Sequence, residues 1–181
     1  ILGTTGSSPI GIALDAAGNV YTANFNSNTV SKITTDGTST ILGTTGAGPQ
    51  RIALDAAGNV YTGNYGSSNV SKITPEGIST ILGTTGSGPY GIALDAAGNV
   101  YTTNRATDNV SKITPDGIST ILGTTGDYPF GIALDAAGNV YTGNNSSANV
   151  SKITPASTAS YLADGDTSPI TITGLTNDTE Y

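Results

Sequence analysis

The 181-residue sequence contains no cysteine, methionine, tryptophan or histidine. The missing cysteine and histidine exclude disulfides, thiolate zinc sites and imidazole acid–base chemistry within these residues. No apolar run approaches the roughly 18 residues of a membrane-spanning helix, and no signal-like segment opens the chain. We therefore expect no membrane insertion and no nucleophile–histidine chemistry.

Basic residues are also few, with 6 Lys and Arg against 13 Asp and Glu. The four lysines are evenly spaced, at Lys32, Lys72, Lys112 and Lys152, so they form no basic stripe. A nucleic-acid partner is therefore not expected. The abundance of glycine, threonine, serine and asparagine suits an exported bacterial protein, so we expect a secreted or cell-surface location.

A twelve-residue stretch, GIALDAAGNVYT at residues 11–22, returns nearly unchanged at 51–62, 91–102 and 131–142, with a period of 40. Each unit predicts four short strands, at residues 11–15, 19–24, 29–34 and 39–43 in the first copy. The first two strands are joined by a tight turn, in which Asp15 can accept backbone hydrogen bonds and Gly18 can supply a positive φ. A second turn at residues 34–37 closes the next hairpin.

The predicted strands are apolar on both faces, as Val30 and Ile33 illustrate on one strand. Such a sheet needs a neighbour in front and behind. The sequence therefore predicts an all-β fold of four-stranded antiparallel blades, arranged around an axis as in a β-propeller or in line as in a solenoid.

The pattern PxGIALDxxGNVYxxN, followed by NVSKI and a turn, resembles the blade of NHL-type β-propellers, including the virginiamycin-lyase-like group. The resemblance covers residues 1–155 and implies a propeller with four blades in this chain, whereas such propellers usually have about six. The ring is then small, cut, open or completed by another chain. Exposed blade faces favour a homo-oligomer or further domains of a longer chain.

The two ends of the chain bear on closure. Residues 1–6 match the outermost strand of a blade, and in a closed ring they would pair with the last blade. Residues 156–181 form either a degenerate fifth blade or, as we favour, a fragment resembling a fibronectin type III domain. The chain is then predicted to be a piece of a modular surface protein.

Two sets of polar residues are copied in every repeat. The aspartates Asp15, Asp55, Asp95 and Asp135 could form a carboxylate ring for calcium, but an Asp before Ala-Ala-Gly-Asn more simply satisfies its own turn. The asparagines Asn24, Asn64, Asn104 and Asn144 could line a cup for sugar hydroxyls, but we expect them to bridge their loops. We predict no metal site and no cofactor.

Differences between the repeats gather in two loops per blade, one before the first strand and one between the second and third. Because antiparallel strands alternate in direction, both loops emerge at the same end of the blade. This end, the varied face, is predicted to bind a glycan, peptide or partner protein. Its candidate binding residues are Ile10, Phe25, Gln50, Arg51, Tyr65, Tyr90, Arg105, Tyr128 and Phe130.

The predicted function is accordingly a non-enzymatic binding or scaffold module. One alternative is a structural protein that self-assembles into a closed oligomer or a filament. Another is a metal-dependent propeller enzyme, with a metal held for instance between Asp108 and Asp127. We predict no catalytic residues, because a lyase of the virginiamycin-inactivating kind would lack its expected histidine base.

Overall fold

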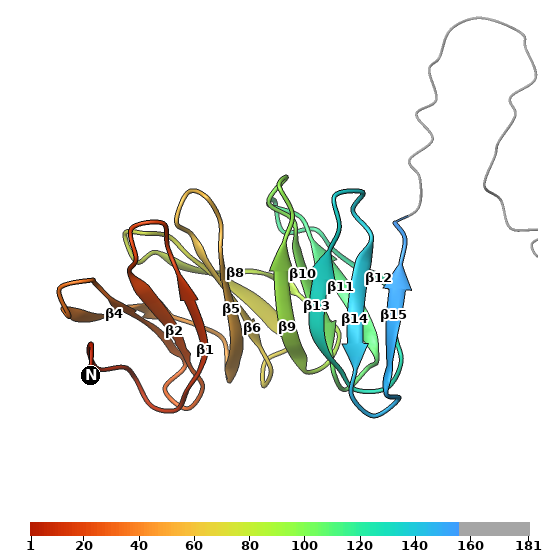
Figure 1. Cartoon of the computed structure of the whole chain (residues 1–181), viewed down its shortest axis with the longest axis horizontal. Helices are drawn as coiled ribbons and strands as arrows, with labels where there is room; N and C mark the ends of the chain where they lie inside the picture. The colour runs from red at the N-terminus through yellow and green to blue at the C-terminus, as the bar shows by residue number, and fades with distance from the viewer. Residues whose placement is uncertain (156–181) are drawn as a thin grey trace, which may run out of the picture.

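Four antiparallel β-sheets stand in a row in the computed structural model, which describes residues 1–155 (Figure 1). Three sheets have four strands and the last has three, which confirms the predicted all-β blades. Most strand ends lie within one residue of those predicted, although the first strand of each blade begins two residues earlier.

The first blade comprises β1 (Pro9–Leu14), β2 (Val20–Asn24), β3 (Thr29–Ile33) and β4 (Ser39–Thr44). The second comprises β5 (Pro49–Leu54), β6 (Val60–Asn64), β7 (Asn69–Ile73) and β8 (Ser79–Thr84). The third comprises β9 (Pro89–Leu94), β10 (Val100–Asn104), β11 (Asn109–Ile113) and β12 (Ser119–Thr124), and the fourth β13 (Pro129–Leu134), β14 (Val140–Asn144) and β15 (Asn149–Ile153).

The turn between the first two strands of each blade is built as the sequence predicts. The Asp15 carboxylate accepts hydrogen bonds from the backbone N–H groups of Ala17 (3.0 Å) and Asn19 (2.9 Å). Gly18 takes a φ of 84°, which a residue with a side chain rarely adopts. The turn therefore satisfies its own backbone donors and fixes the register from Leu14 opposite Val20 onward.

The hydrophobic core lies between the blades. Tyr21 and Val30 of the first blade pack against Ile52, Val60 and Ile73 of the second, and equivalent clusters join the second blade to the third and the third to the fourth. Each sheet is therefore apolar on both faces, as the two-sided pattern of its strands predicts. Burial of a valine or isoleucine side chain is worth about 1.5–3 kcal/mol, so each blade is held mainly by its neighbours.

The two outer blades each leave one of these faces uncovered. Val110 is fully buried against the fourth blade, but the equivalent Val150 is 70% exposed. At the other end of the row, Ile12 is 66% exposed, whereas the equivalent Ile52 is 9% exposed. The described part of the chain is therefore an open array with two complementary apolar end faces.

Residues 1–6 do not pair with the last blade, as they would in a closed ring. They run along the first blade, where the Ser39 hydroxyl accepts a hydrogen bond from Thr4 N–H (2.9 Å) and the Ser31 hydroxyl accepts one from Gly6 N–H (3.0 Å). Thr44 at the end of β4 and Gly46 just after it make the same contacts with the second blade. The last blade, ending in β15, lies at the opposite end of the row (Figure 1).

The prediction for residues 156–181, a fifth blade or a fibronectin type III fragment, falls outside the described residues. Within residues 1–155, no helix is long and apolar enough to cross a membrane.

Candidate functional site

The two varied loops of each blade meet in the structure, as predicted. The backbone N–H of Phe25 donates to the Ser8 carbonyl oxygen (2.9 Å), and that of Arg105 donates to the Gly88 carbonyl oxygen (2.9 Å). The other two blades repeat this bond with the same length. The varied loops thus form one paired edge per blade, and the array brings four such edges together.

A β-bulge shapes the inner side of this edge. The first strands of consecutive blades lie next to one another. In each of them the register with the second strand shifts just after the proline, for example between Pro9 and Gly11. The bulge falls on Ile10 and its counterparts Gln50, Tyr90 and Phe130, four of the predicted binding residues. Bulges of this kind redirect a side chain and are frequent beside functional sites.

Five of the nine predicted residues form one continuous stack across the second, third and fourth blades. The rings of Tyr90 and Phe130 are stacked, with centroids 4.7 Å apart and an interplanar angle of 20°. The Arg51 guanidinium lies over Tyr90, with its Cζ 5.2 Å from the ring centroid. The Arg105 guanidinium lies 4.7 Å from the Tyr128 centroid and 5.2 Å from that of Phe130. We call these five residues the arginine–aromatic stack.

Arg105 has an unusual environment within the stack. Its Nε is buried and has no hydrogen-bond partner in the described part of the chain. A buried donor without an acceptor typically costs about 1–3 kcal/mol. The stack therefore contains an unused donor.

The other four predicted residues do not join the stack. Phe25 covers Gly48 of the next blade, and Tyr65 covers Gly88 in the same way, so both rings fill loop-to-loop contacts. Gln50 is buried, and Ile10 is 40% exposed at the open end of the array. Their predicted binding role stays a prediction.

One structural role on this face was missed at the level of sequence. Asp108 was considered as a metal ligand, but its carboxylate accepts a hydrogen bond from Tyr128 N–H of the next blade (2.9 Å). Asn28 makes the equivalent bond to Gly48 N–H (2.8 Å). The signal was present in the repeat, because Asn and Asp tolerate the positive φ found at both positions, 54° and 49°. Within residues 1–155, no group of three or more acidic side chains could hold a metal ion.

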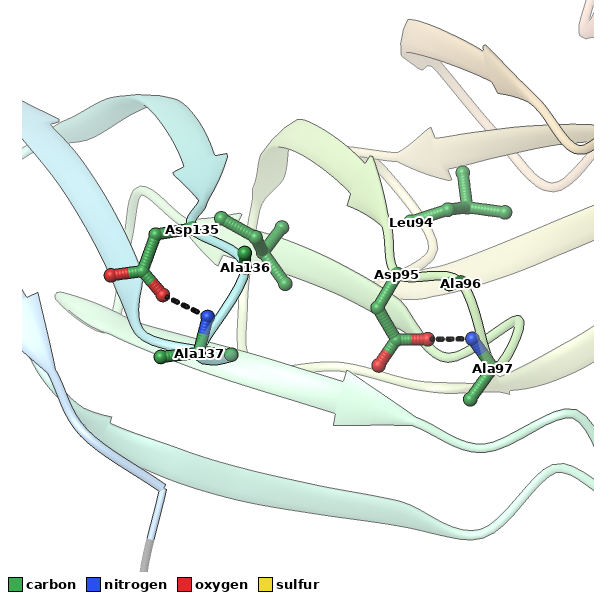
Figure 2. Close-up of a pocket in the computed structure, with 9 residues that line it drawn as sticks. Leu94, Asp95, Ala96, Ala97, Asp135, Ala136 and Ala137 are labelled. Atoms are coloured by element: carbon green, nitrogen blue, oxygen red, sulfur yellow. Dashed lines mark hydrogen bonds between the residues drawn. The ribbon is translucent and has the colours of Figure 1, made fainter.

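The opposite end of the array carries the copied turns and two grooves between them. One groove of about 560 Å³ lies between the turns at residues 94–97 and 134–138, and another of about 470 Å³ lies between those at 14–17 and 54–58. Figure 2 shows why their aspartates have little capacity for a ligand: Asp95 and Asp135 each turn an oxygen toward a backbone N–H of their own turn, at Ala97 and Ala137.

Both carboxylate oxygens of each copied aspartate are occupied. Besides the two backbone bonds, Asp95 accepts bonds from the Asn99 amide (2.7 Å) and the Tyr101 hydroxyl (3.0 Å). Burial alone would raise the pKa of Asp95, but the hydrogen bonds from Asn99, Tyr101 and Ala97 outweigh it and lower the pKa. Burial, aided by the Asp95 carboxylate, raises the pKa of Tyr101 to about 12. The aspartates serve their turns, as the sequence favoured.

The copied asparagines are structural as well. Asn64 is fully buried, and its amide donates to Asn69 Oδ1 (2.7 Å) and Ser71 Oγ (2.8 Å) while its oxygen accepts from Thr62 (2.8 Å). The amide thus bridges the loop between the second and third strands. This leaves the varied face, rather than the copied residues, as the candidate site.

Comparison with known proteins links this fold to one family. A family model described as the virginiamycin B lyase family matches residues 1–180. A catalytically inactive histidine-to-alanine variant of virginiamycin B lyase from Staphylococcus aureus, solved with quinupristin, superposes with a TM-score of 0.68 at 24% identity, over 85% of this chain and 58% of that one. A streptogramin B lyase structure gives 0.67 at 19% identity, over 86% and 57%. The selenomethionine form of the Staphylococcus aureus enzyme gives 0.68 at 21% identity, over 87% and 59%.

No curated protein sequence matches this chain. The chain spans between 57% and 59% of the solved neighbours. The match overturns the expectation of a non-enzymatic protein, because the family and these neighbours are named for lyases. That expectation was based on the absence of histidine, which holds for these 181 residues alone.

Proposed function

We propose that the varied face of this chain recognises a ligand. The chain belongs to the virginiamycin B lyase family, and its varied face carries the arginine–aromatic stack. The stack is the observation that carries the proposal. Its side chains come from three blades, yet they contact one another at 4.7–5.2 Å between ring centroids or between a ring and a guanidinium. Arginine and aromatic side chains held on a rigid scaffold are typical of binding hot spots.

The contrast between the two ends of the array supports this assignment. At the copied end, every aspartate oxygen is already bound by its own turn, and the grooves are lined otherwise by alanine, leucine and glycine. At the varied end, the two guanidiniums of the chain lie over rings, and Arg51 is exposed to solvent. Polar groups free to recognise a ligand are therefore concentrated at the varied face.

Saturation-transfer NMR tests the proposal. A set of small aromatic compounds, with quinupristin included because it is present in a neighbouring structure, is screened against the wild-type chain. We expect several compounds to bind, and Tyr90→Ala to abolish their signals by removing the centre of the stack. Ala97→Ser, in a groove at the opposite end, is the control and should bind as the wild type does. Equal loss in both variants, or binding that Tyr90→Ala leaves intact, refutes the proposal.

The same face is where we place a lyase reaction. A lyase needs a group that takes up a proton and donors that stabilise developing negative charge. The varied face offers the guanidiniums of Arg51 and Arg105 as such donors, and the hydroxyls of Tyr90 and Tyr128 as relays that accept a proton from the ligand while they pass their own to water. The test is the disappearance of intact quinupristin by liquid chromatography and mass spectrometry, with Tyr90→Phe as the variant that loses the hydroxyl and keeps the ring.

A second candidate function, self-assembly, has support from the end faces. Val150 is exposed on the fourth blade, whereas its equivalent Val110 on the third blade is buried by the blade that follows. Ile12 is exposed on the first blade, whereas its equivalent Ile52 on the second blade is buried by the blade that precedes it. A second copy can therefore dock end to end and repeat the contact already made three times within the chain. Sedimentation velocity distinguishes the cases: a monomer at micromolar concentration excludes this function.

A further inference from the structure

We infer that copies of this chain join head to tail by strand donation, in which residues 1–4 of one copy pair with β15 of another and complete its fourth blade. The inference rests on the second function proposed above, self-assembly, and specifies its partner, its direction and its register. It does not depend on the ligand of the varied face.

Residues 2–6 lie on the first blade in the place that an outer strand takes on the blade that follows it. A Cβ placed on Gly37 would meet the Leu2 carbonyl oxygen at 2.8 Å, as one placed on Gly77 would meet that of Leu42 at 2.6 Å. The two hydrogen bonds that this segment donates to the first blade also have direct counterparts around the end of β4. The segment therefore already has the position of the outer strand of a preceding blade.

The strand that such a segment would pair with is available at the other end of the row. The strands β3, β7 and β11 each pair on both sides, whereas β15 pairs within residues 1–155 with β14 alone. Residues 1–4 and β15 lie at opposite ends of the row, so they do not meet within one copy (Figure 1). The free edge of a strand offers unpaired N–H and C=O groups that a strand from another chain can bind.

The end faces beside these strands fit each other as consecutive blades do. Inside the array, Pro89 lies 3.6 Å from a Cβ placed on Gly63 of the preceding blade. The equivalent Gly143 has no atom within 4 Å in the described part of the chain and borders a hollow of about 440 Å³. Pro9, the counterpart of Pro89, is exposed. Pro9 of a second copy therefore fits the hollow beside Gly143.

The repeat also sets the register of the donated strand. In the first blade, Thr44 lies opposite Thr29, and the second and third blades use the same register. The equivalent pairing between two copies places Thr4 opposite Asn149. It also covers Leu2, which is exposed in one copy and whose counterparts in later repeats pack into the core between blades. A slip by one residue would turn this side chain away from that core.

Single-cysteine variants test the pairing, because the chain has no cysteine of its own. Protein with Thr4→Cys is mixed with protein with Asn149→Cys in oxidised glutathione, and disulfide-linked dimers are followed on non-reducing gels. Opposed residues of antiparallel strands have Cβ atoms about 4.5–5.5 Å apart, close to the spacing of a disulfide. We expect the mixture to form linked dimers at least tenfold faster than either protein alone.

Thr44→Cys is the matched control for Thr4→Cys. Thr44 is equivalent to Thr4 and equally exposed, but it already lies opposite Thr29 in its own blade. Mixed with Asn149→Cys protein, it should form linked dimers no faster than random collision allows. Equal rates for the Thr4→Cys and Thr44→Cys mixtures contradict the inference, because the contact would then have no register.

A gain of association tests the same contact from the varied loops. Asn28 accepts a hydrogen bond from Gly48 N–H of the next blade (2.8 Å), but its equivalent Ala148, with a φ of 50°, has no side-chain acceptor. In the docked pair, Ala148→Asn would accept a hydrogen bond from Ser8 N–H of the second copy. We expect this variant to lower the Kd of association about fivefold. Ser68→Asn, the same change inside the array, should leave the Kd unchanged, and an unchanged Kd in Ala148→Asn contradicts the inference.

Sedimentation velocity of the wild-type chain separates this inference from the function on which it rests. If the chain associates but Thr4→Cys and Asn149→Cys proteins do not link faster than the control, strand donation is wrong and self-assembly stands. If the chain stays a monomer at micromolar concentration, both are wrong. Neither result bears on recognition at the varied face.

Discussion

Replacing one valine by alanine at two equivalent positions measures how much each blade depends on its neighbour. Val110 and Val150 occur in the same NVSKI segment, one repeat apart, on strands of the same length. Val110 is fully buried against the fourth blade, and Val150 is 70% exposed. The substitution is chemically identical in both cases, so only the presence of a following blade differs.

The expected cost follows from the packing. Val→Ala removes two methyl-sized groups, each worth about 0.8 kcal/mol when buried. A remaining cavity adds to this, so Val110→Ala should lower the free energy of unfolding by about 2 kcal/mol. Val150→Ala should change it by less than about 0.5 kcal/mol, as is usual for exposed positions.

Equilibrium unfolding in urea, at several protein concentrations, provides the measurement. Val70→Ala serves as a repeat of the buried case, because Val70 is also fully buried. Equal losses at Val110 and Val150 would refute the reasoning, since Val150 would then be covered in solution. If the loss at Val150 grew with protein concentration, the covering element would be a second copy.

Three further predictions concern the loops, pH and the end faces. Ser68→Asn should raise the free energy of unfolding by about 0.5–1.5 kcal/mol, because Ser68 has a φ of 50° and an asparagine there can accept a hydrogen bond from Gly88 N–H, as Asn28 does from Gly48 N–H. Thermal unfolding measures the change, with Ser67→Asn as the control variant. No gain in stability for Ser68→Asn contradicts the prediction. The copied aspartates have lowered pKa values in the folded chain, so the stability they add is present above a pH of about 3.8 and is lost as the pH falls through the folded pKa. In Asp95→Asn, the urea concentration at the unfolding midpoint should therefore fall less on acidification than in the wild type. An equally steep fall in both proteins counts against the prediction. Val150→Asp should prevent any end-to-end association seen by sedimentation without unfolding the monomer, and persistence of the oligomer would exclude this face as the contact.

The sequence predicted the blades well because a 40-residue repeat displays its own turn chemistry and two-sided strands. Comparison of the copies also located the varied face, where both loops meet. The sequence could not predict which of the nine candidate binding residues contact one another, because these contacts depend on a bulge at Tyr90 and Phe130 and on the spacing between blades. Phe25 and Tyr65 look the same in sequence but pack over glycines.

Two expectations depend on more than the described residues. The expectation of a non-enzymatic protein was wrong, since absent residue types in one chain do not define the chemistry of a family. The secreted or cell-surface location and the identity of any partner stay predictions, because composition alone supports them.

The central claim is that ligand recognition belongs to the varied face and not to the copied turns. Two-dimensional NMR of the labelled chain, with the aromatic compounds that bind in the saturation-transfer screen, tests it most directly. The account predicts that the shifted signals gather at Arg51, Tyr90, Arg105 and Phe130, with the turns unchanged. Shifts that gather instead around the copied turns at residues 94–97 and 134–138 would contradict it.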